Sequence, residues 1–300
     1  MSSQKSNVLL LLAALIWGLA FVAQRVGMEH IGPFTFNGVR FALGALSLLP
    51  LMVYFDRKQG KMDQVPHIWK AALKPGLIVG LVLFCAASLQ QIGLIYTEAG
   101  KAAFVTGLYM VFVPIVGYVL FKQRLAKTAV LGTVMAVVGL YFLSVKTGFE
   151  IERGDLFELC GSLFWTAHIL IIDAYVKRID ALRLAFYQFI VCSVLCMAAA
   201  VIFETITWQG ITLTAVPILY GGICSVGVAY TLQIVGQKYA KPSQAAIVLS
   251  METLFAGIGG YFILNERLGS VELLGCVLMF AGMLLSQIRI KDTSLKDSHG

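Results

Sequence analysis

Charged residues are scarce in this sequence. Asp, Glu, Lys and Arg make up 13% of its 300 residues, whereas a soluble domain carries about 25%. Hydrophobic residues supply 59% of the chain, and the segments between apolar runs are too short to form a separate soluble domain. This composition argues against a soluble protein and predicts a polytopic membrane protein.

Catalytic signatures are absent as well. The sequence has no HExxH pair, no G-x-S-x-G elbow and no phosphate-binding loop, and only one of its four histidines, His168, lies in a predicted span. We therefore predict no enzyme activity, no catalytic residues and no cofactor. A membrane enzyme stays as one alternative. A channel or receptor without alternating access is another, although no repeated ring of charge favours a channel and no soluble module favours a receptor.

The six cysteines fall inside predicted spans and do not form the disulfide framework of a secreted protein. Two of them share a helix face at i, i+4 spacing, which would allow a metal pair, but no His or acid stands at matching spacing. We predict apolar packing and no metal site. The cysteines are Cys85, Cys160, Cys192, Cys196, Cys224 and Cys276.

Ten apolar segments approach the roughly 20 residues that a helical span requires. Only helices and closed barrels satisfy the backbone in lipid, and barrel strands would alternate apolar and polar residues. We predict an all-α integral membrane fold with ten transmembrane helices. These cover residues 8–25, 34–55, 75–96, 101–121, 128–145, 156–172, 182–203, 214–236, 243–264 and 270–290.

Lys and Arg set the orientation. With the N-terminus in the cytoplasm, 17 of them fall on inner segments and 5 on outer segments, and Arg40 lies within a span. Both chain ends are then cytoplasmic, in a multi-pass protein of the cell membrane. This inner bias accounts for the net charge of +7, so we predict lipid headgroups as partners and no nucleic acid.

The second half of the chain repeats the first. Residues 90–144 recur from Gln233 onward at a constant offset of 143, and a weaker match at an offset of 148 joins the front of each half. We predict two modules, at residues 1–146 and 147–290, and a disordered cytoplasmic tail at 291–300. Matched positions include Gln90 and Gln233, Gly93 and Gly236, Gly132 and Gly275, Gly139 and Gly282, and, at the second offset, Trp17 and Trp165.

Five spans per half is an odd number, so the second half must enter the bilayer from the opposite side. Inverted repeats let one sequence adopt outward-open and inward-open packings of similar energy, with the substrate near the midplane. The counting therefore predicts a secondary transporter that works by alternating access.

Each half resembles the five-helix module of the drug/metabolite transporter superfamily, in particular the two-module EamA-type permeases. The resemblance covers residues 8–290. The first module departs from the family pattern at Gln123, which stands where the second module has Glu266. The motifs that carry it are Leu15-Ile16-Trp17-Gly18, Pro33 to Arg40, Ala99 to Pro114, and Asn265-Glu266-Arg267-Leu268 followed by Gly275 and Gly282.

The resemblance implies transport of small organic solutes, often export of amino acids or related metabolites. It also implies a central cavity bounded by the first four helices of each module, with the fifth helix peripheral. Proton coupling is one option for the energy source. The oligomeric state is open between monomer and homodimer.

Polar residues inside spans are our candidates for the transport path, because a central charge costs about 2.5 to 3.5 kcal/mol on insertion scales. Arg40 and Asn37, at i, i+3, form one such pair that could hold a carboxylate; alternatively Arg40 snorkels to the interface. Glu252 is a candidate for proton coupling or a structural acid between helices. Three acids near span ends, Glu98, Glu158 and Asp173, are expected to be solvated at the interface.

Three glutamines extend this set: Gln90, its neighbour Gln91, and its repeat mate Gln233. Helix-to-helix hydrogen bonding is the other role open to them. Tyr187 and Gln188 stand in place of Val39 and Arg40. One half thus presents a cation and the other an amide, which suits a zwitterion or an anion.

Trp17 and Trp165 lie well inside their spans and could stack on a substrate, close a gate or fill space between helices. Ser162 shares the face of Trp165, and His168 lies about 60 degrees from it on a helix. His168 either titrates near neutral pH or donates to a carbonyl.

Thr106 and Tyr109 bring hydroxyls to the fourth span. Backbone satisfaction is the alternative role for both. Pro114 should kink the same helix, and the matching Gly257 could bend at the same depth. We predict this pair as gating hinges.

Overall fold

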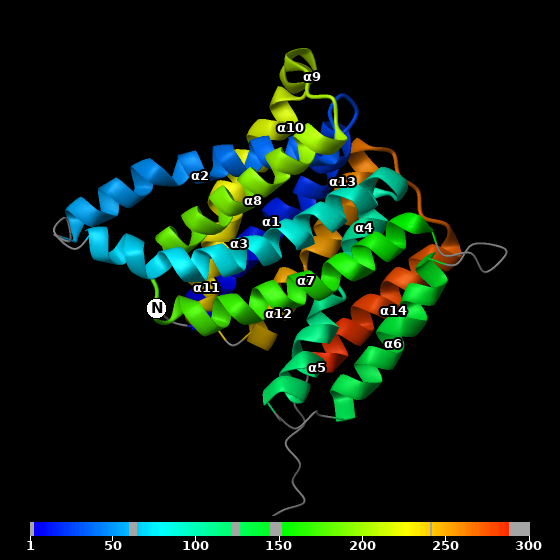
Figure 1. The fold of residues 1–300 in the computed structure, drawn as a ribbon. Helices are drawn as coiled ribbons and strands as arrows, with labels where there is room; N and C mark the ends of the chain where they lie inside the picture. Colours follow the sequence, from blue (N-terminus) through cyan, green and yellow to red (C-terminus); the bar gives the residue numbers. More distant parts are fainter. Residues whose placement is uncertain (1–2, 60–64, 122–126, 145–151, 241, 288–300) are drawn as a thin grey trace, which may run out of the picture.

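The computed structural model describes residues 3–59, 65–121, 127–144, 152–240 and 242–287. Within these ranges every regular element is a helix, and none is a strand (Figure 1). The all-helical prediction is therefore confirmed for the described part of the chain. Gln123 and the tail at 291–300 lie outside the described residues.

Among the described residues, eight helical segments are long and apolar enough to cross a membrane by length and composition, so the chain is a multi-pass membrane protein. Two shorter apolar helices, α6 (Lys127–Ser144) and α14 (Ser270–Gln287), coincide with the remaining predicted spans. The eight are α1 (Ser3–Gly27), α2 (Pro33–Lys58), α3 (Val65–Tyr96), α4 with α5 (Ala99–Thr106, Tyr109–Phe121), α7 (Arg153–Val176), α8 (Ala181–Phe203), α10 with η2 and α11 (Ala215–Leu219, Tyr220–Tyr230, Thr231–Gln237), and α12 with α13 (Pro242–Leu249, Glu252–Ile263).

Two helix starts are fixed by carboxylates from distant parts of the chain, which satisfy backbone N–H groups that a first turn leaves free. Glu204, just after α8, accepts hydrogen bonds from Phe34 N at 2.7 Å and Thr35 N at 2.8 Å. Glu266 accepts from Ala99 N at 2.8 Å and Gly100 N at 3.0 Å. These contacts anchor the first turns of α2 and α4.

Two spans are interrupted at matching positions. Between α4 and α5 the backbone switches to i→i−3 bonds, with Leu108 N donating to Val105 O at 3.2 Å. Between α12 and α13 the equivalent bond runs from Met251 N to Val248 O at 3.3 Å, at the repeat offset of 143. The next three backbone bonds repeat in the same register. Both spans thus contain a short tightened turn at the same depth.

These interruptions do not fall at the predicted hinges. Pro114 lies inside α5 and Gly257 inside α13, where the helices continue. The break at Gly107 instead lies against the second interrupted span, because a Cβ added there would stand 2.7 Å from Thr253 Cγ2. Close packing between the two spans, rather than proline chemistry, accompanies the breaks.

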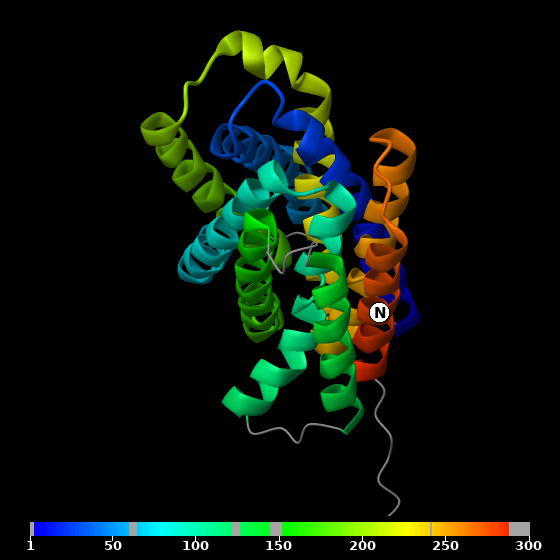
Figure 2. The same cartoon turned by 90° about the vertical axis from the view of Figure 1, so that its right-hand side faces the viewer.

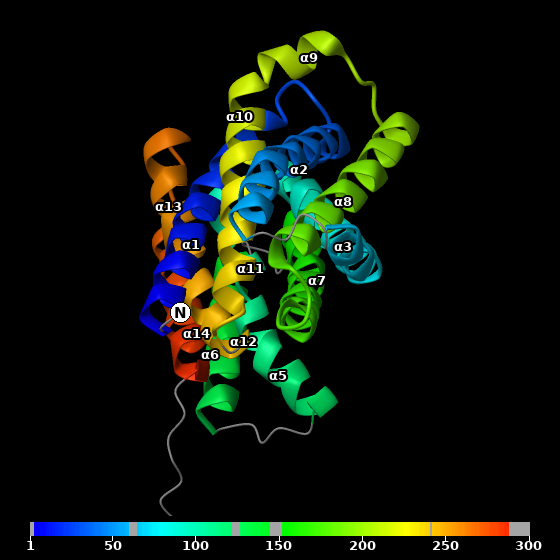
Figure 3. The same ribbon diagram turned by 90° about the vertical axis from the view of Figure 1, so that its left-hand side faces the viewer.

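The helices form two packed groups with α6 and α14 on one side (Figures 1 and 2). One apolar core joins α1, α5, α12 and α14, and a second joins α2, α3, α7 and α8. Figure 3 shows α10, η2 and α11 as one column beside α1. Trp17 and Trp165 pack against both cores, so they stand where the two groups meet.

α6 and α14 pack antiparallel through glycines. A Cβ on Gly139 would lie 2.7 Å from Gly275 O, and a Cβ on Gly282 would lie 2.5 Å from Gly132 O. These two contacts exchange under the offset of 143. Absent side chains therefore allow backbone-to-backbone approach at both ends of the crossing.

Candidate functional site

A cavity of about 470 Å³, counting all space not filled by atoms, lies among the helices at the level of the two interrupted spans. It is lined by Trp17, Phe21, Gln24, Arg40, Gln90, Thr106, Tyr109, Trp165, Ile169, Ser225, Tyr230, Gln233, Leu249 and Glu252.

The structure brings half of the predicted path residues together around this cavity. Those that line it are Trp17, Arg40, Gln90, Thr106, Tyr109, Trp165, Gln233 and Glu252. The others that we predicted do not line it: Asn37, Gln91, Ser162, His168, Tyr187 and Gln188, together with Pro114 and Gly257.

Arg40 is the cation of the cavity and is 3% exposed. Its Nε donates to Asn37 Oδ1 at 2.9 Å, so the predicted i, i+3 pair forms and the side chain does not snorkel to an interface. The guanidinium lies 5.0 Å from the centre of the Phe41 ring and 5.5 Å from that of Phe36. Among the described residues no carboxylate lies within ion-pair distance of Arg40.

Asn37 supports Arg40 from behind. Its amide donates to Ala87 O on α3 at 3.0 Å, which fixes its carbonyl oxygen toward the guanidinium. Asn37 is therefore a positioning residue rather than a lining residue.

Glu252 is the acid of the cavity. It begins α13, at the second helix break, and is 5% exposed. Tyr109, at the first break, donates its hydroxyl to Glu252 Oε1 at 3.0 Å. The two interrupted spans are thus joined by a hydrogen bond at the cavity wall.

Trp17 and Trp165 are repeat mates, but their indole N–H groups donate to different acceptors. Trp165 Nε1 donates to Gln90 Oε1 at 2.9 Å, whereas Trp17 Nε1 donates to the backbone oxygen of Ser225 at 3.2 Å. Gln233 Oε1, the counterpart of the Gln90 acceptor, is buried and has no partner among the described residues. The second module thus leaves an acceptor open at the cavity.

An 11-residue π-helix, η2, accompanies this difference. Ser225, in the middle of η2, presents its backbone oxygen to Trp17. Tyr230, the last residue of η2, lies on the cavity wall. The Tyr230 ring lies 4.7 Å from that of Trp17 and 6.1 Å from that of Trp165. π-Helical turns occur frequently at functional sites.

Most of the predicted residues outside the cavity connect helices, and Ser162 bonds within its own helix. His168 Nε2 and Gln188 Oε1 are 2.9 Å apart and both residues are fully buried, which joins α7 to α8. Gln91 donates to Gln24 O at 3.3 Å. Ser162 donates to Leu159 O of its own helix at 2.7 Å. Tyr187 packs on Trp69, with ring centres 5.3 Å apart.

The expectation that Glu158 is solvated at an interface is wrong. Its exposure is 0%, and it accepts a hydrogen bond from Thr106 Oγ1 at 2.6 Å. The sequence places Glu158 a few residues from the start of α7, but α3 and α4 pack over that end of the helix.

Six lining residues were missed: the apolar Phe21, Ile169 and Leu249, and three with polar groups, Gln24, Ser225 and Tyr230. The three polar ones matter most for binding. Spacing could have found two of them. Gln24 is seven residues after Trp17, and Tyr230 is three before Gln233, so each shares a helix face with a predicted residue. The approach of Ser225 depends on the π-helix, which no sequence signal indicated.

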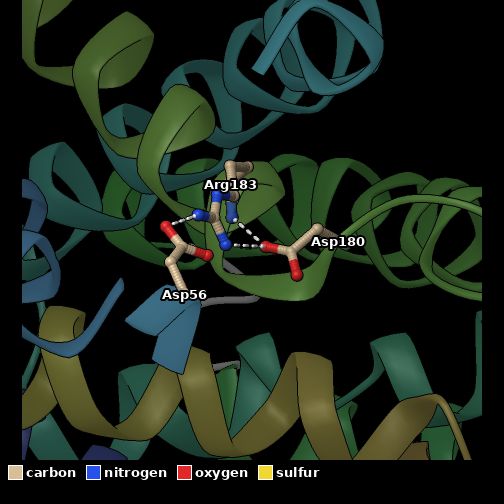
Figure 4. A network of polar contacts seen from close by, with 3 residues as sticks. All are labelled: Asp56, Asp180 and Arg183. Atoms are coloured by element: carbon tan, nitrogen blue, oxygen red, sulfur yellow. Dashed lines mark hydrogen bonds and ion pairs between the residues drawn. The ribbon is translucent and has the colours of Figure 1, made fainter. Parts of the chain in front are cut away.

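A second polar network lies away from the cavity, where α2 ends and α8 begins (Figure 4). Arg183 is 2% exposed and forms ion pairs with Asp56 of α2 and, at 3.1 Å, with Asp180. Asp180 also caps α8 by accepting from Arg183 N at 3.0 Å. This network ties one end of α2 to one end of α8.

The fold is that of a multi-pass membrane protein with an internal cavity among its helices. A family model, the EamA-like transporter family, matches residues 4–145 and 152–287. The chain therefore belongs to that family.

Similar proteins agree with this assignment. An uncharacterized transporter of Archaeoglobus fulgidus is 33% identical over 94% of this chain and 85% of its own length. A probable amino-acid metabolite efflux pump of Escherichia coli is 23% identical over 95% of each chain. A solved crystal structure matches with a TM-score of 0.68 and 16% identity, covering 95% of this chain and 96% of the other, which supports the fold alone.

Proposed function

We propose that the protein is a secondary carrier that exports small metabolites bearing a carboxylate, amino acids or related compounds, by alternating access. Arg40 carries this proposal. A buried charge is costly unless it is paired, and Arg40 has no acidic partner among the described residues while it lines the cavity. A substrate carboxylate would supply the missing anion, in a geometry that guanidinium groups favour.

The rest of the cavity suits an amine on the same substrate. Glu252 adds an acid, and Gln233 Oε1 adds a buried acceptor without a partner. Trp17, Trp165 and Tyr230 would enclose the apolar part. The name of the Escherichia coli relative, a probable amino-acid metabolite efflux pump, agrees with this substrate class.

We infer that ten spans form two inverted five-helix modules, at residues 1–146 and 147–290, with both chain ends in the cytoplasm of a cell-membrane protein. Three observations support this: the antiparallel α6–α14 pair, its glycine contacts that exchange under the repeat offset, and the matching helix breaks. The positive-inside count supports the orientation.

The tightened turns give the carrier its movable parts. Tyr109 and Glu252 follow the two breaks and bond to each other, so a change at Glu252 would act on both interrupted spans. Protonation of Glu252 would remove its charge and couple proton movement to transport. Pro114 and Gly257 would add bending within the half-helices that follow.

Solute counterflow in proteoliposomes tests the carrier function. Liposomes preloaded with an unlabelled compound should accelerate uptake of the same labelled compound, for at least one amino acid in a panel. An enzyme or a channel would show no such acceleration. If the whole panel of amino acids, nucleosides and sugars fails to trans-stimulate, the proposal is wrong.

Three variants test the site. Arg40→Gln should abolish counterflow of the carboxylate substrate, while Arg57→Gln, an exposed arginine on the same helix, should leave it unchanged. Glu252→Gln should remove the pH dependence of flux and keep exchange. Wild-type counterflow in Arg40→Gln would refute the anchoring role, and unchanged pH dependence in Glu252→Gln would refute the coupling role.

A further inference from the structure

Beside the cavity lies a second buried acid that the proposed function leaves without a role. Glu158 is fully buried, and its Oε1 has no hydrogen-bond partner among the described residues. Its Oε2 accepts from Thr106 Oγ1 at 2.6 Å, and Thr106 lines the cavity. One hydroxyl therefore separates this carboxyl group from the cavity.

The carboxyl group fits against a bare backbone. A Cβ added to Gly93 of α3 would stand 2.6 Å from Glu158 Oε1, closer than carbon and oxygen can approach. The glycine thus leaves room for Oε1 and offers it no donor. An ionised carboxylate held there without a cation carries a desolvation cost of several kcal/mol.

Among the described residues, no cation forms an ion pair with Glu158. α7 packs against α3, α4, α5, α11 and α12. From α4, Lys101 Nζ is engaged by Glu152 Oε2 at 2.8 Å and Asp155 Oδ2 at 3.1 Å. From α5, Tyr109 bonds to Glu252. The described segments of α11 and α12 carry no ionisable residue, and α3 meets Glu158 through Gly93. Asp155, on α7 itself, adds another negative charge.

The acids of α7 form a ladder into the protein. Glu152, the N-cap residue of α7, is followed at three-residue spacing by Asp155 and then Glu158, so each acid lies about one turn from the next. The side chain of Glu152 is 24% exposed, that of Asp155 is 3% exposed, and Glu158 is fully buried. The ladder thus leads from the surface to the Thr106 hydroxyl.

The ladder belongs to one module only. The repeat mate of Thr106 is Leu249, which has no hydroxyl, and the mate of Glu158 is Leu10. A path built on these residues therefore opens toward one side of the membrane.

We propose that Glu158 is a proton-binding site that exchanges protons with the cavity through Thr106 and with the surface along Asp155 and Glu152. When a proton from cavity water binds to Thr106 Oγ1, the hydroxyl hydrogen passes to Glu158 Oε2. The step ends with neutral Glu158 and an unchanged hydroxyl. Use of this proton in transport rests on the proposed function, whereas the binding of the proton does not.

Infrared titration of the purified protein tests the site with the hydrogen ion as the probe. A pH series should reveal a carboxylic-acid C=O band that disappears on alkalinisation and is missing in Glu158→Gln. Asp173→Asn, which removes an acid of α7 that pairs with Lys177, should keep the band. Thr106→Val should shift it to higher frequency because the carboxyl group loses a hydrogen bond, and Thr106→Ser should restore its position.

Three results would overturn the proposal. The first is a wild-type spectrum in Glu158→Gln at every pH. The second is a band that no pH removes. The third is its loss on addition of sodium at fixed pH, which would indicate a metal-ion site. If Glu158→Gln does not fold, the Thr106→Val and Thr106→Ser pair decides alone. Failure of counterflow with the band intact would refute the substrate assignment and leave the proton site standing.

Discussion

The glycine crossing of α6 and α14 yields the sharpest stability prediction. In Gly139→Ala the new methyl group would lie 2.5 Å from Met279 N and 2.7 Å from Gly275 O. These are backbone atoms in the middle of a helix, so no rotamer change can relieve the contact. The two helices must move apart along the crossing.

The expected size follows from two opposing effects. Overpacking costs about 1–3 kcal/mol, and contacts with rigid backbone place this case near the upper end. Replacing glycine by alanine inside a helix returns about 1 kcal/mol. We expect Gly139→Ala to lower the free energy of unfolding by about 2 kcal/mol. Gly117→Ala is the matched control, because Gly117 lies in helix α5 with nothing within 4 Å of the new Cβ.

Reversible unfolding in mixed detergent micelles would measure these changes. Gly282→Ala should cost as much as Gly139→Ala, because its Cβ would meet Gly132 O and Ala136 N at 2.5 and 2.7 Å. The double variant should cost less than the two single changes together, since helices already separated accept the second methyl group more easily. If Gly139→Ala and Gly117→Ala stabilise the protein equally, the close crossing is not real.

Three further changes can be measured by the same unfolding assay. Glu266→Ala should cost about 1–2 kcal/mol, the range for a lost helix cap, since two amides of α4 lose their acceptor. Asp56→Asn should cost about 3 kcal/mol, the low end for a broken buried pair, because Asp180 still holds the guanidinium; a loss below that of Asp180→Asn would contradict this. Trp165→Phe should cost about 1 kcal/mol by leaving Gln90 Oε1 without its donor, and a neutral result would show that water replaces the indole.

Features that depend on a single helix, such as which residues share a face, could be predicted from the sequence. Arg40 and Asn37 were paired because residues three apart share a helix face, and in the structure they bond to each other at 2.9 Å. The placement of Trp17, Gln90 and Glu252 on the cavity followed the rule that polar or isolated aromatic groups inside a span face protein or water.

Packing contacts between different helices could not be predicted from the sequence. Glu158 is near the start of its span, so distance along the chain indicated an interface, whereas packing by α3 and α4 buries it. The helix breaks were expected at Pro114 from its missing N–H. They occur instead where Gly107 meets Thr253, a meeting that depends on the tertiary arrangement.

The π-helix from Tyr220 to Tyr230 shows one way in which the two halves of a duplicated protein can come to differ in structure. Each wide turn holds more residues than an α-turn, so the segment absorbs extra chain without lengthening the span. One deleted residue there would tend to wind the column back into α-geometry and withdraw the Ser225 oxygen from the Trp17 indole. Specialisation of the two halves can thus arise from winding alone, even when the side chains remain identical.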